Sequence, residues 1–211
     1  MPSAWLIASA FIGYLLGSLP FGYLVARAHG VDIFKAGSGN PGATNVKRVL
    51  GAKAGNTVFA LDAVKGALAA AWPMLPLLHA PDVRMMGLVG VIAAVLGHSF
   101  SIFTKFKGGK GVATAAGGLV VLMPVSCAIG AVVWVVTFLL TRYVSLGSIL
   151  AAVAVPAASW LRGNPLPLNI VATAVGLFVI VRHRENIRRL LNGTENKFVR
   201  KAAGPGSPPP G

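Results

Sequence analysis

Apolar runs long enough to cross a bilayer constrain this chain more than any other feature. A transmembrane helix needs about 20 apolar residues, and several such runs follow one another in the 211 residues. Charged residues make up only 11% of the chain, whereas a soluble domain contains about 25%. We therefore expect an all-α integral membrane protein with a single domain at residues 1–203. The Pro/Gly-rich tail at 204–211 is expected to be disordered.

Six apolar runs mark the expected spans, and one of them is too long for a single comfortable helix. The first run lacks a basic start, so we interpret it as a retained span rather than a cleaved signal peptide. The long run contains Pro124, which permits either one tilted helix or two shorter helices. The runs cover approximately residues 4–26, 56–78, 86–103, 112–141, 146–161 and 168–181.

The positions of lysine and arginine favour two helices in the long run. With the N-terminus outside and two passes through 112–141, only Arg84 and Arg162 fall outside. A single pass would place the C-terminal basic cluster on the side opposite the lysines of 105–110. The positive-inside rule thus predicts a seven-transmembrane-helix bundle with a cytoplasmic C-terminus. Some helices are then short, the fourth having about 11 residues, or ~16 Å.

The net charge of +14 is the feature that a nucleic-acid-binding protein would share. Here the cations lie in short segments between apolar runs, which is typical of membrane topology signals. Such segments also attract anionic lipids and anionic substrates. We expect membrane lipids and no nucleic acid as partners. Cys127, the only cysteine, excludes an intrachain disulfide and a cysteine metal cluster.

Four polar segments fall on the inner side in this topology. In GSGNPGATNV, residues 37–46, three glycines free the backbone to turn N–H groups toward a ligand just before a helix, and such turns favour anions. KGGKG, residues 107–111, repeats the arrangement but lacks the Ser or Thr of a Walker A loop. Two anion-suited loops indicate one or two ligands with more than one phosphate. The remaining polar segments are 141–148 and 181–198.

Several cations and histidines have two possible explanations. Lys105 and Lys107 fit a topology signal as well as a site, while the basic residues from Arg188 onward fit a lipid surface better. His98 is either a helix-end hydrogen-bonding group or a catalyst. His183 is the stronger catalytic candidate because Arg, Glu and Asn follow it directly. Further donors to an anion could come from Arg48, Arg142 and Arg184.

Two ionisable residues, Asp62 and Lys65, fall inside an expected span. Ionisable groups at membrane depth are costly and usually functional. Because these two residues are three apart, they could instead simply pair on one helix face. Both interpretations remain open from the sequence.

Carboxylates are scarce, which restricts the chemistry. Too few are present for a carboxylate-rich metal site or for paired-carboxylate hydrolysis, and neither a His-x4-Asp pair nor a GxSxG motif occurs. A site made of donors and cations suits group transfer with a phosphate leaving group. The carboxylates are Asp32, Asp62, Asp82, Glu185 and Glu195.

Three motifs in order resemble those of the bacterial PlsY family of acyl-phosphate:glycerol-3-phosphate acyltransferases. They are SGNPGATNVKR (38–48), GHSFSIFTKFKGGKGVAT (97–114) and HRENIRRLLNGTEN (183–196). The resemblance implies transfer of a fatty acyl group from acyl phosphate to the 1-position of glycerol 3-phosphate, which gives lysophosphatidate and phosphate. It also implies no cofactor, no metal and no acyl-CoA. We expect a monomer in the bacterial inner membrane with its active site facing the cytoplasm.

The resemblance also implies roles for individual residues. The acyl phosphate would lie against Ser38, Gly39, Asn40, Gly42, Ala43, Thr44 and Asn45. Glycerol 3-phosphate would bind through Arg48, Lys107, Lys110, Ser148, His183 and Asn186, and the catalytic residues would be Ser38, Asn45, Lys110 and His183. The base is left open between the donor's own phosphate oxygen, His183 and His98.

Two other functions share part of this pattern. A transporter of a small phosphorylated compound would also have a helix bundle and a cationic site, but the polar motifs gather at one face with no matching set on the other. A non-catalytic lipid-binding protein would not need two glycine loops flanked by cations. The discriminating observation is release of free phosphate when both substrates are present.

Overall fold

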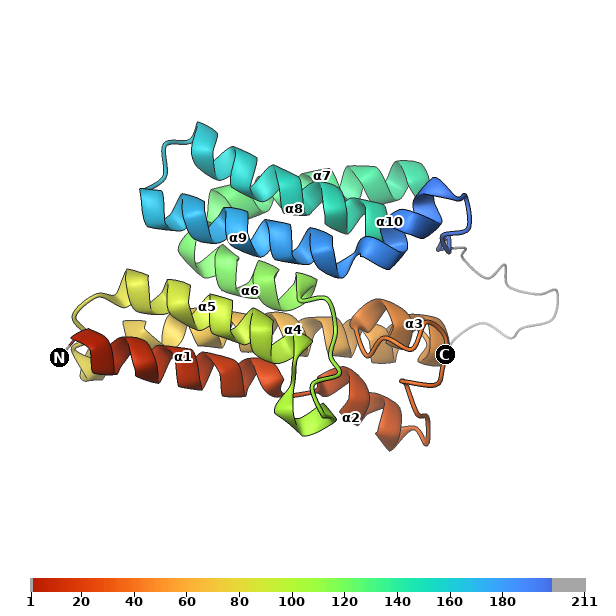
Figure 1. The fold of residues 1–211 in the computed structure, drawn as a ribbon, viewed down its shortest axis with the longest axis horizontal. Coiled ribbons are helices and arrows are strands. Elements are labelled where there is room, and N and C mark those ends of the chain that lie inside the picture. Colours follow the sequence, from red (N-terminus) through yellow and green to blue (C-terminus); the bar gives the residue numbers. More distant parts are fainter. Residues whose placement is uncertain (1, 199–211) are drawn as a thin grey trace, which may run out of the picture.

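The structure, a computed structural model, describes residues 2–198. Within that range the chain forms ten α-helices and three short 3-10 helices, and no strand occurs among them. The long helices lie side by side (Figure 1). The α-helices are α1 (Pro2–Ser18), α2 (Phe21–Ala28), α3 (Ala43–Leu50), α4 (Ala52–Ala71), α5 (Val83–Ser99), α6 (Val112–Leu122), α7 (Pro124–Thr141), α8 (Val144–Leu161), α9 (Leu166–Arg182) and α10 (Arg184–Leu191); the 3-10 helices are Trp72–Met74, Pro76–Leu78 and Ile102–Thr104. The predicted tail at 204–211 lies outside the described residues.

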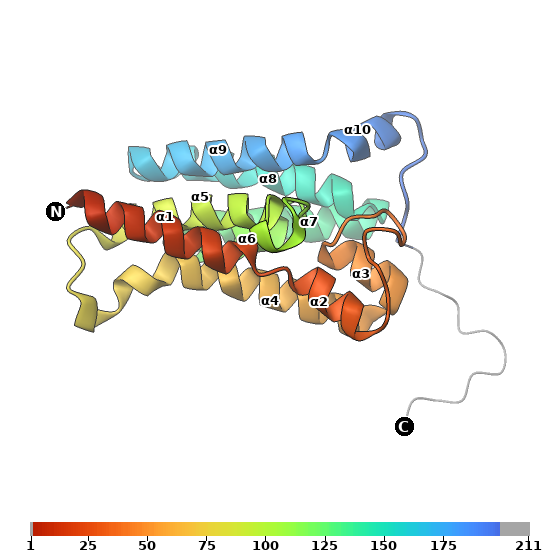
Figure 2. The ribbon, with the colours of Figure 1, turned by 60° about the horizontal axis from the view of Figure 1, so that its bottom comes forward.

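The short helix α6 lies between two groups of long helices. On one side α1 packs on α5 and α4 packs on α6, and on the other α7 packs on α8 and α8 on α9. Figures 1 and 2 show this arrangement from two directions. The buried core runs through the junction between the groups. Its apolar side chains include Leu88, Val91, Val95, Leu119, Leu168, Val171 and Val175.

Small residues allow the helices to approach closely, as expected for packing in lipid. A methyl group placed on Gly13 would lie 2.5 Å from the Gly90 carbonyl oxygen, and one on Gly17 would lie 2.1 Å from that of Ala94. The backbones of α1 and α5 are therefore in direct contact. No larger residue fits at either position without separating the two helices.

The first predicted span, 4–26, is not one continuous helix. The chain leaves the helical path at Leu19 and Pro20 and resumes as α2 at Phe21. Proline lacks the N–H that would continue the ladder and disfavours helix at the residue before it. The run is still confirmed as one candidate span, Ser3–Ala28. The second prediction, 56–78, extended too far, because α4 ends at Ala71. That error comes from apolar residues that continue past Pro73.

The expected division of the long run at Pro124 is confirmed. Residues 112–141 form two helices, α6 with 11 residues and α7 with 18, joined at Met123. Four segments of the described chain are apolar and long enough to cross a membrane, or five if α9 and α10, which meet at a 57° bend, count as one span. The described residues thus form a multi-pass helical membrane protein.

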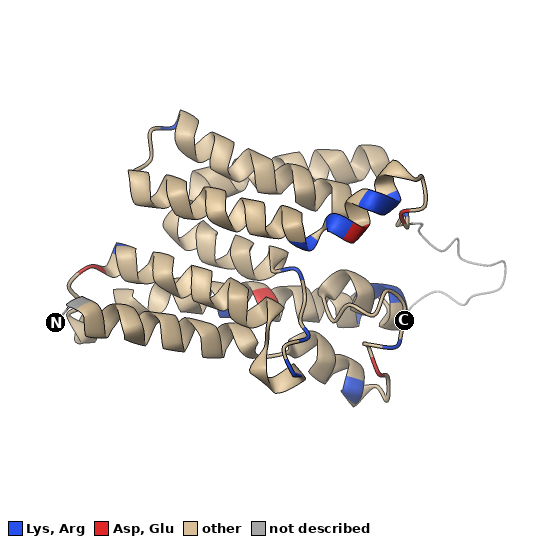
Figure 3. Ribbon diagram, viewed as in Figure 1, with Lys and Arg blue, Asp and Glu red and all other residues tan. Residues whose placement is uncertain are grey.

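Charged residues gather at one end of the bundle. Figure 3 shows most lysine and arginine residues at the end where α2, α3 and α10 lie, and few at the end that holds the N-terminus. This asymmetry agrees with the distribution on which the topology was predicted. The four predicted polar segments all lie at the charged end, and a cavity is found among them.

Candidate active site

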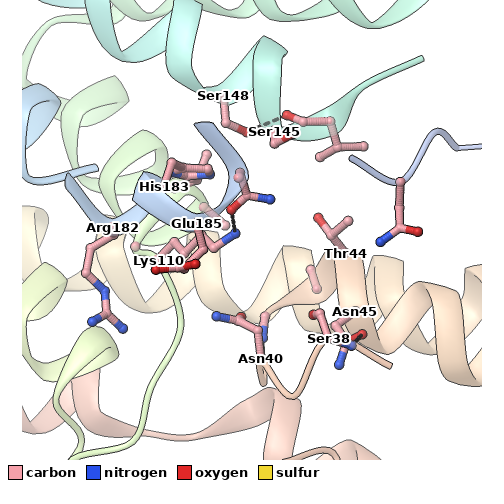
Figure 4. A pocket seen from close by; sticks show the side chains of 18 of the residues that line it. Ser38, Asn40, Thr44, Asn45, Lys110, Ser145, Ser148, Arg182, His183 and Glu185 are labelled. Atoms are coloured by element: carbon pink, nitrogen blue, oxygen red, sulfur yellow. Dashed lines mark hydrogen bonds between the residues drawn. The ribbon is translucent and has the colours of Figure 1, made fainter. Parts of the chain in front are cut away.

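A cavity of about 390 Å³ opens at the charged end of the bundle. All four predicted polar segments contribute to its wall, as expected. Figure 4 shows side chains of the 38–45 loop and α3 on one side, with those of α8 and the α9–α10 junction across from them. The predicted residues that line it are Ser38, Asn40, Gly42, Ala43, Thr44, Asn45, Arg48, Lys110, Ser148, His183 and Asn186.

The loop before α3 takes its shape from two glycines and one buried asparagine. Gly37 and Gly39 have φ of +59° and +68°, a region that other residues rarely adopt. The side chain of Asn45 accepts a hydrogen bond from the Ser38 N–H at 2.9 Å and donates one to the Ala36 carbonyl at 2.9 Å. Because Asn45 is only 2% exposed, it fixes the loop from within.

The conformational role expected of Gly42 was wrong. Its φ of −72° and ψ of 160° are an extended conformation open to any residue. Gly42 is instead the N-terminal cap of α3, and the first turn of a helix leaves N–H groups without partners in the helix. The N–H groups of Ala43 and Thr44 occupy that first turn at the cavity wall. They are suited to an anion.

The second anion-suited loop brings one lysine into the cavity and leaves another outside. Lys110 lines the cavity and donates a hydrogen bond to Asn186 Oδ1. Lys107 is exposed and lies away from the cavity wall, as does Gly39. Burial lowers the pKa of Lys110 to about 8, with Glu195 opposing the shift and Arg189, Arg182 and Arg48 adding to it.

Arginine contributes from three elements. Arg48 in α3 lies at the exposed rim of the cavity, and Arg184 at the start of α10 also lines it. Arg142 does not reach the cavity, and its guanidinium lies 6.0 Å from the centre of the Phe138 ring. Arg182, which the sequence had not singled out, lines the cavity and donates to the carbonyls of Gly108 and Gly109 at 3.2 and 2.9 Å.

Glu195 is a second cavity residue that sequence reasoning missed. Its carboxylate accepts hydrogen bonds from Ser145 Oγ, Asn186 Nδ2 and Arg189 Nε, each at 2.7 Å. Burial raises the pKa of Glu195, but these three bonds outweigh it and hold the pKa below its ordinary value. Arg189, assigned above to a lipid surface, therefore belongs to the cavity. The signal available was that Glu195 is one of only five carboxylates and lies in the third motif.

His183 is buried at the junction of α9 and α10 with one ring nitrogen occupied. Its Nδ1 lies 2.7 Å from the Val179 carbonyl, and since a carbonyl only accepts, Nδ1 carries the proton. Burial, and then the charge of Lys110, lowers the pKa of His183 to about 4. The imidazole is thus neutral at pH 7, with Nε2 free of a proton.

The remaining wall comes from α4, α5, α6, α7 and α8. Ser148 Oγ accepts a hydrogen bond from Trp134 Nε1 at 3.2 Å and donates to the Val144 carbonyl at 2.9 Å. Asp62 in α4 and His98 in α5 also line the cavity, and Phe59 and Trp134 add apolar surface. No group of three or more His, Cys, Asp or Glu residues that could hold a metal ion occurs in residues 2–198.

The chain is similar over most of its length to known membrane acyltransferases. Residues 7–193 match the family Glycerol-3-phosphate acyltransferase. A protein of that name from Synechococcus sp. is 46% identical and covers 95% of this chain and 98% of its own, and one from Allorhizobium ampelinum is 43% identical over 93% of both. The crystal structure of PlsY, an integral membrane glycerol 3-phosphate acyltransferase, in its glycerol 3-phosphate form has a TM-score of 0.84 at 42% identity, covering 92% of this chain and 96% of that one.

Proposed function

This chain belongs to the glycerol-3-phosphate acyltransferase family, and we propose that the cavity at its charged end holds both substrates at once, glycerol 3-phosphate and an acyl phosphate. The protein is a membrane enzyme that transfers a fatty acyl group to glycerol 3-phosphate in phospholipid synthesis. The observation that carries the two-substrate proposal is that two anion-suited segments, one before α3 and one before α6, line the same cavity. Each of the two segments can hold the phosphate of one substrate.

The donor phosphate lies at the start of α3. The N–H groups of Ala43 and Thr44, with the Ser38 hydroxyl at the rim, meet the phosphate of the acyl phosphate. These donors stabilise the charge that collects on that phosphate as it leaves. Asn45 acts as a positioning residue, because both of its polar groups are engaged within the loop.

Glycerol 3-phosphate lies toward the α9–α10 junction, with its phosphate near Lys110 and with Arg48 approaching it from α3. Asn186 holds Lys110, and Glu195 in turn holds Asn186. Ser148 and His183 face the glycerol hydroxyl groups. This arrangement brings the 1-hydroxyl near the acyl carbon, and such positioning lowers a reaction barrier by several kcal/mol.

The transfer itself needs no group from outside these two substrates. The glycerol oxygen forms a bond to the acyl carbon, and the bond from that carbon to the phosphate oxygen breaks. The phosphate departs with the bonding electrons, and the hydroxyl proton goes to one of its oxygens. His98 is poorly placed to act as the base, since Gly109 packs against its Nε2 and Asp62 lies 3.5 Å from its Nδ1. His183 has a free Nε2, but a pKa of about 4 is far from the value near 7 that suits a general base.

We expect His183→Gln to keep turnover within about threefold of the wild type while raising the KM for glycerol 3-phosphate. Glutamine keeps a hydrogen-bonding group at the cavity but cannot take a proton at neutral pH. The measurement is the initial rate at saturating substrate. A fall in kcat of a hundredfold or more, with KM unchanged, would instead make His183 the base.

The bundle crosses the membrane seven times, with α1 and α2 counted together and α4 to α9 each crossing once. The cavity faces the cytoplasm of the bacterial inner membrane, because the end that holds it carries most of the cations. Labelling of a cysteine introduced at Arg84 by an impermeant reagent added outside intact cells checks this orientation. Labelling of a cysteine at Lys35 from the same side contradicts it.

The donor is tested with purified protein and glycerol 3-phosphate, with palmitoyl phosphate in one reaction and palmitoyl-CoA in the other. We expect lysophosphatidate and free phosphate from palmitoyl phosphate alone, because the cavity is lined for a phosphate leaving group. Product from palmitoyl-CoA would overturn the assignment of the donor. Absence of product from either, with the protein folded, would favour the transporter alternative.

A further inference from the structure

Asp62 and Lys65 form an ion pair inside α4. Lys65 Nζ lies 2.7 Å from Asp62 Oδ1, and the two side chains are 3–4% exposed. The alternative left open by the sequence, that they pair on one helix face, is therefore confirmed. A buried pair persists only where its geometry is good and its remaining donors and acceptors are satisfied. Its further contacts indicate what else it does.

Lys65 reaches the break between α1 and α2. Its Nζ donates a hydrogen bond to the Leu19 carbonyl at 2.8 Å, and its ammonium lies 5.5 Å from the centre of the Phe21 ring. Ser101 Oγ donates to the adjacent Ser18 carbonyl at 2.5 Å. At this break the Ser18 and Leu19 carbonyls thus accept hydrogen bonds from side chains of the segment after α5 and of α4.

The start of α2 then supports the loop that precedes α3. A methyl group on Gly22 would lie only 1.6 Å from the Pro41 carbonyl oxygen, so the two backbones are in direct contact. A shift at the break would move α2, and with it Pro41 and the 37–45 loop. Lys65 is connected to the acyl-phosphate side of the cavity through this contact.

Asp62 is connected to the other loop through His98. Asp62 Oδ1 lies 3.5 Å from His98 Nδ1. The His98 carbonyl accepts a hydrogen bond from the Gly109 N–H at 3.2 Å, and a methyl group on Gly109 would lie 2.2 Å from His98 Nε2. Gly109 directly precedes Lys110. The Asp62–His98 contact therefore supports the segment that brings Lys110 into the cavity.

We propose that Asp62, Lys65 and His98 are positioning residues that fix the two anion-binding loops relative to each other. The inference rests on the proposed function, since it concerns the distance between the two bound substrates. These residues act through the loops and not on the reacting atoms. A displacement of about 1 Å between the reacting groups can lower a rate by roughly a hundredfold. The cluster therefore affects turnover as well as stability.

The test compares Asp62→Asn, Lys65→Met and the double variant. Each single change leaves one buried charge without its partner, and we expect lower stability together with a fall in kcat of at least ~10-fold. The double change removes both charges, so thermal stability recovers to near the wild-type value. Activity does not recover, because the Leu19 carbonyl loses its Lys65 donor and His98 loses the negative charge of Asp62.

Hydrogen exchange measured by mass spectrometry provides a readout that does not depend on catalysis. In the double variant we expect faster exchange in residues 37–46 and 105–112 and unchanged exchange in α7 and α8. The matched control is Asp32→Asn with Lys35→Met, an exposed pair with the same spacing whose closest approach is 3.8 Å. It should change neither kcat nor exchange in the loops.

Two results would overturn the inference. One is a double variant that regains kcat along with stability, since the cluster would then be structural only. The other is exchange that rises equally in every helix. If the wild type itself makes no lysophosphatidate, the proposed function fails, while the exchange measurement still decides whether the cluster holds the two loops.

Discussion

Replacing Lys110 with methionine is expected to lower kcat/KM for glycerol 3-phosphate by roughly a hundredfold. A charge-assisted hydrogen bond to a phosphate contributes about 2–3 kcal/mol, and 1.4 kcal/mol corresponds to a factor of ten. Lys110 is the lysine that lines the cavity in the described part of the chain. Steady-state kinetics with acyl phosphate held saturating measure the effect, which should fall mainly on KM.

Lys107 is the matched control for this experiment. It is three residues away on the same segment, carries the same charge and is exposed outside the cavity. Lys107→Met should keep kcat/KM within about twofold. Equal losses in the two variants would mean that the general positive charge of the segment, and not a contact made by Lys110, binds the substrate.

The ionisation of Lys110 should be visible in the pH dependence of kcat/KM. Burial lowers the pKa of Lys110 to about 8, so the ammonium is present below pH 8 and is lost as the pH rises above it. Because kcat/KM reports ionisation in the free enzyme, it should fall above about pH 8. Lys110→Arg keeps its charge throughout this range, and its profile should stay level there. A fall that persists in this variant would identify another group.

Replacing Gly37 with alanine is expected to lower turnover by at least ~30-fold. A φ of +59° is strained for alanine, and the added methyl group would lie 2.3 Å from Asn45 Oδ1. That oxygen accepts a hydrogen bond from the Ser38 N–H. The added methyl group would displace the Asn45 side chain and break this hydrogen bond, which shapes the loop. The kcat at saturating substrates measures the effect, together with thermal unfolding of the purified protein.

Gly30→Ala separates backbone strain from this contact. Gly30 also has a positive φ, +73°, but a methyl group there would meet nothing within 4 Å. It should cost about 1 kcal/mol of stability and leave turnover near that of the wild type. If both alanine variants lose turnover equally, strain alone explains the effect and Asn45 does not shape the site.

Local patterns in the sequence were enough to find most helices and both anion-binding loops. Apolar length identified α5, α7, α8 and α9, and Pro124 correctly divided the long run because proline ends a helix through its own geometry. Hydropathy did not reveal the break before α2, since Leu19 and Pro20 are both apolar. The glycine loops were visible because their function depends on adjacent residues.

The rest of the site depends on partners that are far apart in the sequence. Ser145 and Glu195 are 50 positions apart, and neither has a neighbour that indicates the pairing. Lys107 and Lys110 flank the same two glycines, and their difference arises only when the backbone turns one of them inward. The role of Gly42 was misjudged for a similar reason, because composition does not reveal which glycine has a positive φ.

The position of Glu195 also affects how the protein is made. Every helix from α1 to α10 precedes this carboxylate, which holds Asn186 and so supports Lys110. A nascent chain can therefore insert all of its spans while its catalytic centre is still incomplete. At about 5–20 residues per second, synthesis from Ser38 to Glu195 takes roughly 8 to 30 s. A messenger truncated shortly before codon 195 would direct synthesis of a membrane-inserted protein that cannot consume its substrates.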